Sequence, residues 1–202
     1  MSQPEQQRVI VGISGASGVI YGVRLLKMLR ELGITSHLVM TRSAEVTLAH
    51  EMAMKVAEVR DLADVFHRID DIGASIASGS FRTLGMVVAP CSIRSLSEIA
   101  SGVTSSLLTR AADVVLKERR KLVLMVRETP FHLGHLRSMT AATEAGAIIM
   151  PPVPAFYAKP ESLEAMVDQS VGRALDLFGI DSEAVRRWQG TGARVNSSAS
   201  KD

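Results

Sequence analysis

The chain of 202 residues is long enough for one domain with a sizeable core, and its hydrophobic share of 47% predicts further surface buried in a homo-oligomer. Its 23 basic and 21 acidic residues leave a net charge of +2, which gives no reason to expect nucleic acid or a membrane as a partner. The single cysteine, Cys91, excludes an internal disulfide and fits a reducing cytoplasm, where we therefore expect the protein to reside.

The N-terminal stretch has the pattern of a strand, a glycine-rich turn and a helix. An apolar run from Val9 to Ile13, too short to span a bilayer and preceded by polar residues rather than a signal peptide, leads into a turn that ends at Gly18. Such a turn offers backbone N–H groups and a positive helix end to a phosphate, and Ser17 is expected to cap the helix and face the ligand. Ser14 stands where the dinucleotide motif G-x-G-x-x-G has its second glycine, so two interpretations stay open: a phosphate site, or a tight turn with a capping serine.

Apolar runs and amphipathic segments alternate along the rest of the chain. Further strands are predicted at 36–41, 84–90, 121–126 and 147–150. Helices are predicted at 43–54, from 91–95 onward, at 104–119, 132–145 and 161–178, with a helix and a short strand within 57–71. Loops are predicted at 74–80 and 151–157. This alternation predicts a single-domain α/β fold, a Rossmann- or flavodoxin-like doubly wound parallel sheet within residues 1–188, followed by a flexible tail at 189–202.

Polar residues follow several of the predicted strands, at the points where ligands of open α/β sheets bind. These are the turn before Gly18, Thr41, the run from Cys91 to Ser95, and Arg127 with Glu128. In a doubly wound sheet such points converge on one crevice. Ser92 and Ser95 are expected either to bind a phosphate or a ring edge there or simply to cap the helix that follows.

The charged residues near this crevice have both a functional and a structural interpretation. Arg127 is expected to be ion-paired, and Glu128 is either its partner or an acid–base group. Arg110 and Lys117, seven residues apart on one predicted helix, project from a similar face. They either clamp a second phosphate or form ion pairs with acidic neighbours on the same helix.

Three other kinds of site are not indicated by the sequence. Cys91 has no histidine nearby in the sequence, so it is expected to pack in the core rather than act as a nucleophile. His132 and His135 have no further ligand at a convincing spacing, so no metal is expected. A G-x-S-x-G nucleophile elbow is missing as well, which argues against a serine hydrolase.

Ordered motifs along the chain carry a family resemblance. They are Gly12–Gly18 (GISGASG), Ala77–Ser80 (ASGS), Val88–Ser92 (VAPCS), Arg110–Arg120 (RAADVVLKERR), Leu122–Pro130 (LVLMVRETP) and Pro151–Tyr157 (PPVPAFY). Together they resemble the flavin prenyltransferases of the UbiX/Pad type. The resemblance implies a homo-oligomer, typically a dodecamer, that joins the prenyl unit of dimethylallyl phosphate to reduced FMN without a metal. The product, prenylated FMN, serves a partner decarboxylase of the UbiD type.

The resemblance also implies roles for individual residues. The positions that match FMN contacts in the family are Gly15, Ala16, Ser17, Thr41, Ser92, Ile93, Arg94, Ser95 and Arg127. The positions that match ligands of dimethylallyl phosphate are Arg110, Lys117, Tyr157 and Arg173, with the family's phosphate ligands coming from adjacent subunits. The positions that match catalytic residues are Ser17, expected between the reacting ends of the two substrates, and the acidic Glu51 and Glu128.

One segment departs from the family pattern. Many members carry a tryptophan before the Ala77–Ser80 motif, where this chain has a shorter segment with Ile72, and its single tryptophan is Trp188. The shorter segment resembles the subgroup of the family that is paired with hydroxyarylic acid decarboxylases. Two other functions stay open: an FMN-dependent decarboxylase of the cysteine-decarboxylase-like superfamily, whose early catalytic histidine is matched by neither His37 nor His50, and a non-catalytic flavin carrier.

Overall fold

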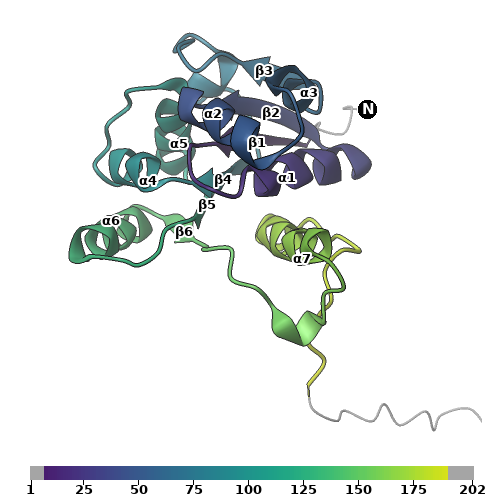
Figure 1. Ribbon diagram of the computed structural model, residues 1–202. Coiled ribbons are helices and arrows are strands. Elements are labelled where there is room, and N and C mark those ends of the chain that lie inside the picture. Colours follow the sequence, from purple (N-terminus) through teal and green to yellow (C-terminus); the bar gives the residue numbers. More distant parts are fainter. Residues whose placement is uncertain (1–6, 191–202) are drawn as a thin grey trace, which may run out of the picture.

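The fold is built on one sheet of six parallel strands in the order β3-β2-β1-β4-β5-β6 (Figure 1). The computed structural model describes residues 7–190. The strands are β1 (Arg8–Ile13), β2 (Thr35–Met40), β3 (Val65–His67), β4 (Gly85–Cys91), β5 (Lys121–Val126) and β6 (Ala147–Ile149). Val11 of β1 pairs with Leu38 of β2 on one side and with Val87 of β4 on the other. The strand order reverses between β1 and β4, and this reversal marks the point where open α/β sheets bind ligands.

Helices cover both faces of the sheet. They are α1 (Val19–Glu31), α2 (Arg42–Glu51), α3 (Val56–Arg60), α4 (Ile93–Ala100), α5 (Leu107–Lys117), α6 (Leu133–Glu144) and α7 (Leu163–Asp176), with 3₁₀ turns η1 (Ser75–Ala77) and η2 (Phe156–Ala158). In Figure 1, α1 and α7 lie on one side of the sheet, and α4, α5 and α6 lie on the other. None of the helices within residues 7–190 has the length and apolar character needed to cross a membrane.

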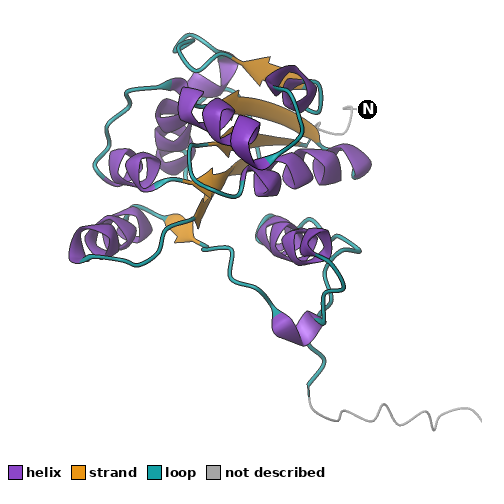
Figure 2. Cartoon of the chain, in the orientation of Figure 1, coloured by secondary structure: helices purple, strands orange, loops and turns teal. Residues whose placement is uncertain are grey.

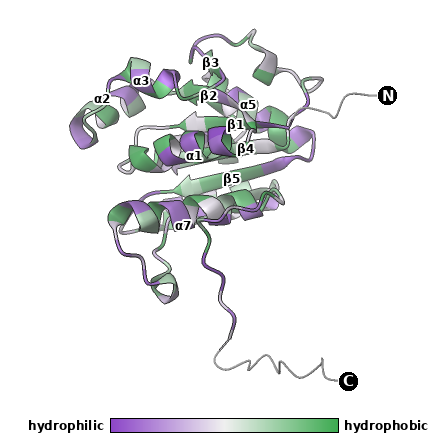
Figure 3. Ribbon diagram, turned by 90° about the vertical axis from the view of Figure 1, so that its right-hand side faces the viewer, coloured by the Kyte–Doolittle hydropathy of each residue, from purple (hydrophilic) through white to green (hydrophobic). Residues whose placement is uncertain are grey.

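Alternate residues of each strand supply two separate cores. In β1, Val11 belongs to the core beneath α1 and α7, whereas its neighbour Ile10 belongs to the core beneath α5. Both faces are apolar because a parallel sheet is covered on both sides, and Figure 3 shows β5 coloured hydrophobic over most of its length. This double burial is the physical reason that the strands read as continuous apolar runs in the sequence.

The chain leaves the sheet after β6 and returns as α7. Figure 2 shows the connecting loop running away from the sheet to the short turn η2 before the chain comes back. An ion pair fastens the returning helix to α1: Arg24 donates through Nε and Nη2 to the two carboxylate oxygens of Asp168, each at 2.6 Å. Bidentate geometry makes this pair both strong and directional.

The predicted fold class, strand order along the chain and helix positions are confirmed, with corrections at several boundaries. The helix expected at 104–119 is shorter because Ser106 caps it and forces its start to Leu107. The two predicted loops each contain a 3₁₀ turn, η1 and η2. The predicted tail lies, from residue 191 on, outside the described residues.

Gly22 of α1 approaches the sheet too closely for a side chain. A Cβ there would lie 2.5 Å from the carbonyl oxygen of Ala89 and 2.6 Å from Cδ1 of Ile13. Gly22→Ala must therefore push α1 off the sheet, and we expect the free energy of unfolding to fall by roughly 1–3 kcal/mol. Urea unfolding at a fixed protein concentration measures this. The control is Gly73→Ala, where the nearest atom lies 3.6 Å from a Cβ, and equal midpoints for the two variants would contradict the prediction.

Candidate functional site

Ser14 joins the carboxyl ends of β1 and β4. Its fully buried hydroxyl donates to the carbonyl of Pro90 at 2.9 Å and accepts from the N–H of Ser92 at 2.7 Å. Its own N–H also donates to the carbonyl of Pro90, at 3.2 Å. Every polar group at this buried crossing is thus hydrogen-bonded, which is what makes its burial tolerable. A serine stands here instead of the second motif glycine because its hydroxyl ties the two strands together.

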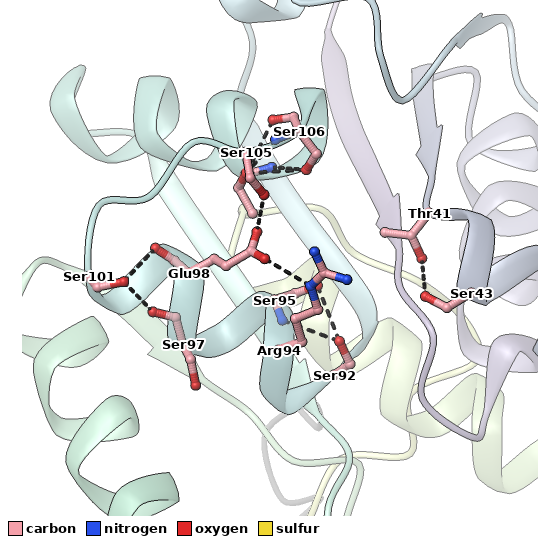
Figure 4. Close-up of polar contacts among 11 residues, drawn as sticks. Thr41, Ser43, Ser92, Arg94, Ser95, Ser97, Glu98, Ser101, Ser105 and Ser106 are labelled. Atoms are coloured by element: carbon pink, nitrogen blue, oxygen red, sulfur yellow. Dashed lines mark hydrogen bonds and ion pairs between the residues drawn. The ribbon is translucent and has the colours of Figure 1, made fainter.

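The glycine-rich turn lies directly against the start of α2. A Cβ on Gly15 would lie 2.3 Å from Oγ of Ser43, so only glycine fits at this position. Thr41 caps α2: its Oγ1 accepts from the N–H of Ala44 at 3.1 Å and lies 3.0 Å from Oγ of Ser43 (Figure 4). The turn and two hydroxyl groups therefore meet at the carboxyl edge of the sheet.

The start of α4 presents a second group of hydroxyls at the same edge. Oγ of Ser92 accepts from the N–H of Ser95 at 3.3 Å and donates to its Oγ at 3.2 Å, so the capping interpretation is realised in this structure. Arg94 is exposed and donates to Glu98 at 2.9 Å, while Ser105 donates to the same carboxylate at 2.6 Å (Figure 4). Burial acts to raise the pKa of Glu98, but these two hydrogen bonds keep it below its ordinary value. The charged carboxylate therefore holds Arg94 close to the helix start.

Glu51, the last residue of α2, occupies the start of α1. Its carboxylate accepts from the N–H of Gly18 at 2.8 Å and of Val19 at 3.1 Å. The nearby hydroxyl of Ser17 also acts to lower the pKa of Glu51. The expectation that Ser17 caps α1 is wrong: Gly18 is the N-cap with φ of 99°, and Glu51 supplies the acceptor and the negative charge that a helix start favours. Burial acts to raise the pKa of Glu51, but the hydrogen bonds and the charge of Arg127 outweigh it, so the pKa lies below its ordinary value.

Arg127 and Glu128 follow β5, and the structure corrects the expectation that Arg127 is ion-paired; of the two alternatives left open for Glu128, it is not the partner of Arg127. The N–H of Arg127 donates to the carbonyl of Cys91 at 3.0 Å, which ties the end of β5 to the end of β4. Its side chain is exposed and forms no ion pair with any other described residue, although its charge acts on Glu51. The half-buried carboxylate of Glu128 accepts instead from the N–H of Thr129 at 3.0 Å. Arg127 is thus a cation at the crevice that is available to an anionic ligand.

Arg110 and Lys117 have the structural contacts of the simpler interpretation. Arg110 pairs with Asp113 at 2.6 Å, and Lys117 pairs with Glu118. Helix α5 runs from the carboxyl edge of the sheet back to the amino edge, where β5 begins, and Lys117 is its last residue. The structure therefore does not bring Lys117 to the crevice of its own chain.

Tyr157 and Arg173 also lie away from the crevice of their own chain. Tyr157 belongs to η2, which projects from the sheet, and its ring meets Trp188 edge-on with centroids 5.9 Å apart. Arg173 lies in the second half of α7 and pairs with Asp176. Phe178, just beyond that helix, lies against the first residue of β4, so this end of α7 is at the amino edge of the sheet. The predicted substrate ligands are thus exposed but not gathered in one chain.

Cys91 packs in the core, as the sequence indicates. Cys91 is buried at the end of β4, and burial raises the pKa of its thiol to about 12, so it is a core residue and not a nucleophile. Within residues 7–190, no cluster of three or more histidine, cysteine, aspartate or glutamate side chains is arranged to hold a metal ion.

Two residues at the site were not recognised from the sequence. Ser43 contacts Gly15 and Thr41, and its position two residues after a predicted strand end was an available signal. Ser14 was noticed only as a departure from a glycine motif, and its partners Pro90 and Ser92 are distant in the sequence. Only the strand order brings such partners together, so no local pattern predicts this contact.

Comparisons with known proteins agree with this geometry. The model of the Flavoprotein family matches residues 2–175. The flavin prenyltransferase UbiX of Escherichia coli K12 is 61% identical over 187 residues, covering 91% of this chain and 99% of that protein. A crystal structure of AnUbiX in complex with FMN and dimethylallyl pyrophosphate superimposes with a TM-score of 0.91 at 49% identity, covering 93% of this chain and all of that one. A dodecameric FMN-dependent UbiX-like decarboxylase from Escherichia coli O157:H7 gives 0.88 at 46% identity, covering 91% of this chain and all of that one.

The charge of Glu51 makes a pH-dependent contribution to stability. Because its pKa in the folded protein lies below its ordinary value of 4.5, this contribution is complete above that pH and is lost as the pH falls through the folded-state value. We expect wild-type protein to have a higher free energy of unfolding than Glu51→Gln at neutral pH, with a difference that shrinks toward zero in acid.

Urea unfolding between about pH 7 and about pH 3 measures this difference. Glu144→Gln is the matched control, since Glu144 also ends a helix but forms no hydrogen bond or ion pair within the described part of the chain. A difference for Glu51→Gln that stays constant with pH would show that its charge does not stabilise the start of α1.

Proposed function

Since the chain belongs to the flavin prenyltransferases of the UbiX type, within the Flavoprotein family, we propose that it transfers the dimethylallyl group of dimethylallyl phosphate to reduced FMN. The product, prenylated FMN, is supplied to a decarboxylase of the UbiD type, and the reaction takes place in the cytoplasm. The observation that carries this proposal is that a glycine-containing turn, two groups of hydroxyls and an exposed arginine meet at the carboxyl edge of the sheet, where the strand order reverses.

The residues of the crevice fit FMN. Gly15 lets the turn pack directly against Ser43, where a Cβ would clash, so its backbone lies at the start of α2 with no side chain in the way. Hydroxyl and cationic groups are the donors that a phosphate requires. The residues that would hold FMN are Gly15, Ala16, Ser17, Thr41, Ser92, Ile93, Arg94, Ser95 and Arg127. Reduced FMN supplies the nucleophilic ring nitrogen and the neighbouring carbon that take up the prenyl unit.

The prenyl donor needs cations, because its carbon–oxygen bond breaks to leave a phosphate dianion. Arginine and lysine side chains placed around that phosphate stabilise the developing charge. Tyr157 and Arg173 bind the phosphate, and Arg110 and Lys117 add positive charge around it. For Arg110 and Lys117 this requires exchange of their present partners for the phosphate, which is inexpensive for exposed ion pairs.

The active site is completed by neighbouring copies of the chain. Lys117 and Arg173 lie toward the amino edge of the sheet, whereas Thr41, Ser92 and Arg127 lie at the carboxyl edge. One chain therefore does not surround both substrates. A homo-oligomer, a dodecamer as in the E. coli O157:H7 neighbour, brings the phosphate ligands of one copy to the FMN crevice of another.

Proton movements fall to the carboxylates beside the crevice. Glu51 is charged at neutral pH, so it accepts protons rather than donating them, and it lies near the hydroxyl of Ser17, which we place between the reacting groups. Glu128, half-buried beside Arg127, takes up the proton released when the new ring closes. These roles follow from position and charge, and both carboxylates remain attached to the backbone of the crevice walls.

Anaerobic incubation of the purified protein with reduced FMN and dimethylallyl phosphate tests the proposal. Mass spectrometry of the released flavin should show a species heavier than FMN by one prenyl unit, and omission of either substrate or of protein is the control. If only unmodified FMN is recovered while FMN still binds, the transferase proposal fails and a flavin carrier takes its place.

A further inference from the structure

A short segment after α7 folds back along that helix, and we call residues 185–188 the C-terminal strap. Gln169 of α7 is only 4% exposed, and its amide pairs with the backbone of Arg186 in both directions. Nε2 donates to the carbonyl at 3.1 Å, and Oε1 accepts from the N–H at 2.8 Å. Next to this pairing, Val185 is buried against Gly172 of α7. A Cβ on Gly172 would lie only 2.5 Å from the side chain of Val185. Helix α7 thus provides a polar anchor and a close-fitting gap for the strap.

The strap supports Tyr157 through two contacts. Nη1 of Arg186 donates to the carbonyl of Ala158 at 3.0 Å, and Ala158, the residue after Tyr157, is buried. The ring of Trp188 meets the ring of Tyr157 at 78° with centroids 5.9 Å apart, an edge-to-face arrangement that aromatic pairs favour. The projecting turn η2 is therefore held by the strap through one hydrogen bond and one aromatic contact.

The same strap supports Arg173. Arg187 donates to both carboxylate oxygens of Asp176, each at 2.9 Å, and Asp176 also pairs with Arg173. The Asp176 side chain is 11% exposed, and the two arginines leave its pKa below the ordinary value, with the hydrogen bond from Arg187 as the largest cause. A carboxylate shared in this way fixes the position of one guanidinium relative to the other.

We propose that the C-terminal strap, anchored by Gln169, is a positioning device that sets Tyr157 and Arg173 relative to each other for capture of the allylic phosphate. The proposal rests on the proposed function, because it assigns the substrate phosphate to those two residues. Tyr157 projects on a loop and Arg173 on a helix, so nothing in the sheet fixes the distance between them. The strap contacts the supports of both, and Gln169 and Arg186 act through it without touching substrate.

The test compares Gln169→Leu, which removes the amide pairing, with Arg186→Ala, which keeps that pairing but removes the side-chain bond to Ala158 and the ion pair with Glu161. Glu161→Gln is the matched control, because Glu161 lies 4.0 Å from Arg186 at an exposed site and does not hold the strap. Trp188 is the single tryptophan, so its fluorescence and its quenching by acrylamide report on the strap alone. KM for dimethylallyl phosphate, kcat, and Kd for FMN are measured on the same full-length proteins.

We expect both variants to make Trp188 more accessible to acrylamide and to raise KM for dimethylallyl phosphate by about tenfold, the scale of one lost hydrogen-bonded contact. Kd for FMN should stay within about twofold of the wild-type value, because the strap does not touch the crevice.

Increased quenching with unchanged KM in either variant would overturn the proposal, as would unchanged quenching and KM in both. Should Gln169→Leu fail to fold, Arg186→Ala, altered at an exposed side chain, decides the question. If the wild-type protein makes no adduct at all, the proposed function has failed rather than the strap alone.

Discussion

The structure depends on the buried hydroxyl of Ser14, which joins β1 to β4 where the strand order reverses. Because Ser14 satisfies the carbonyl of Pro90 and the N–H of Ser92, the two strand ends stay together with no polar group left unpaired at this crossing. Backbone bonds from Thr41 to Ile13 and from Arg127 to Cys91 extend the same edge outward. The turn after β1 and the starts of α2 and α4 are thereby fixed around one crevice. A rigid edge of this kind can hold a ligand at defined atoms, as a transfer between two bound substrates requires.

Charge is distributed around the crevice in a way that the chain pattern alone does not show. The expected anion at the start of α1 is the protein's own Glu51, which binds Gly18 and Val19. The hydroxyls of Thr41 and Ser43 at the start of α2, with the exposed guanidinium of Arg127, are the donors that our proposal assigns to an external phosphate. A carboxylate beside an arginine lets one site hold a phosphate and still accept a proton. The proposed chemistry at this edge thus needs the carboxylate of Glu51 and the guanidinium of Arg127 near each other but without an ion pair between them.

Much of the fold could be predicted from the sequence, because the strands are apolar runs and the helix ends have capping residues such as Ser92 and Ser162. The convergence of Gly15, Thr41 and Ser92 on one edge of the sheet could also be predicted, because residues that follow parallel strands all lie at the same edge. Contacts between distant segments did not follow: Glu51 reaches Gly18 across 33 residues. The family resemblance named candidate functional positions, but it did not show that Lys117 lies at the amino edge of its own chain. The spacing of two residues along a helix predicts whether they share a face of that helix. The fold topology decides at which edge of the sheet each of them lies.

The central claim is that the crevice at the ends of β1, β2, β4 and β5 binds FMN, and Gly15→Ala tests it most directly. Its Cβ would lie 2.3 Å from Oγ of Ser43 and so push the turn away from the start of α2, displacing the backbone proposed to face the phosphate. Titration of FMN into the folded apo-protein, followed by the quenching of flavin fluorescence, should give binding at least about tenfold weaker than in wild type, equivalent to about 1.4 kcal/mol. Gly73→Ala should bind as wild type does. Equal affinity for FMN in wild type and in a Gly15→Ala variant with an unchanged unfolding midpoint would contradict the placement of FMN in this crevice.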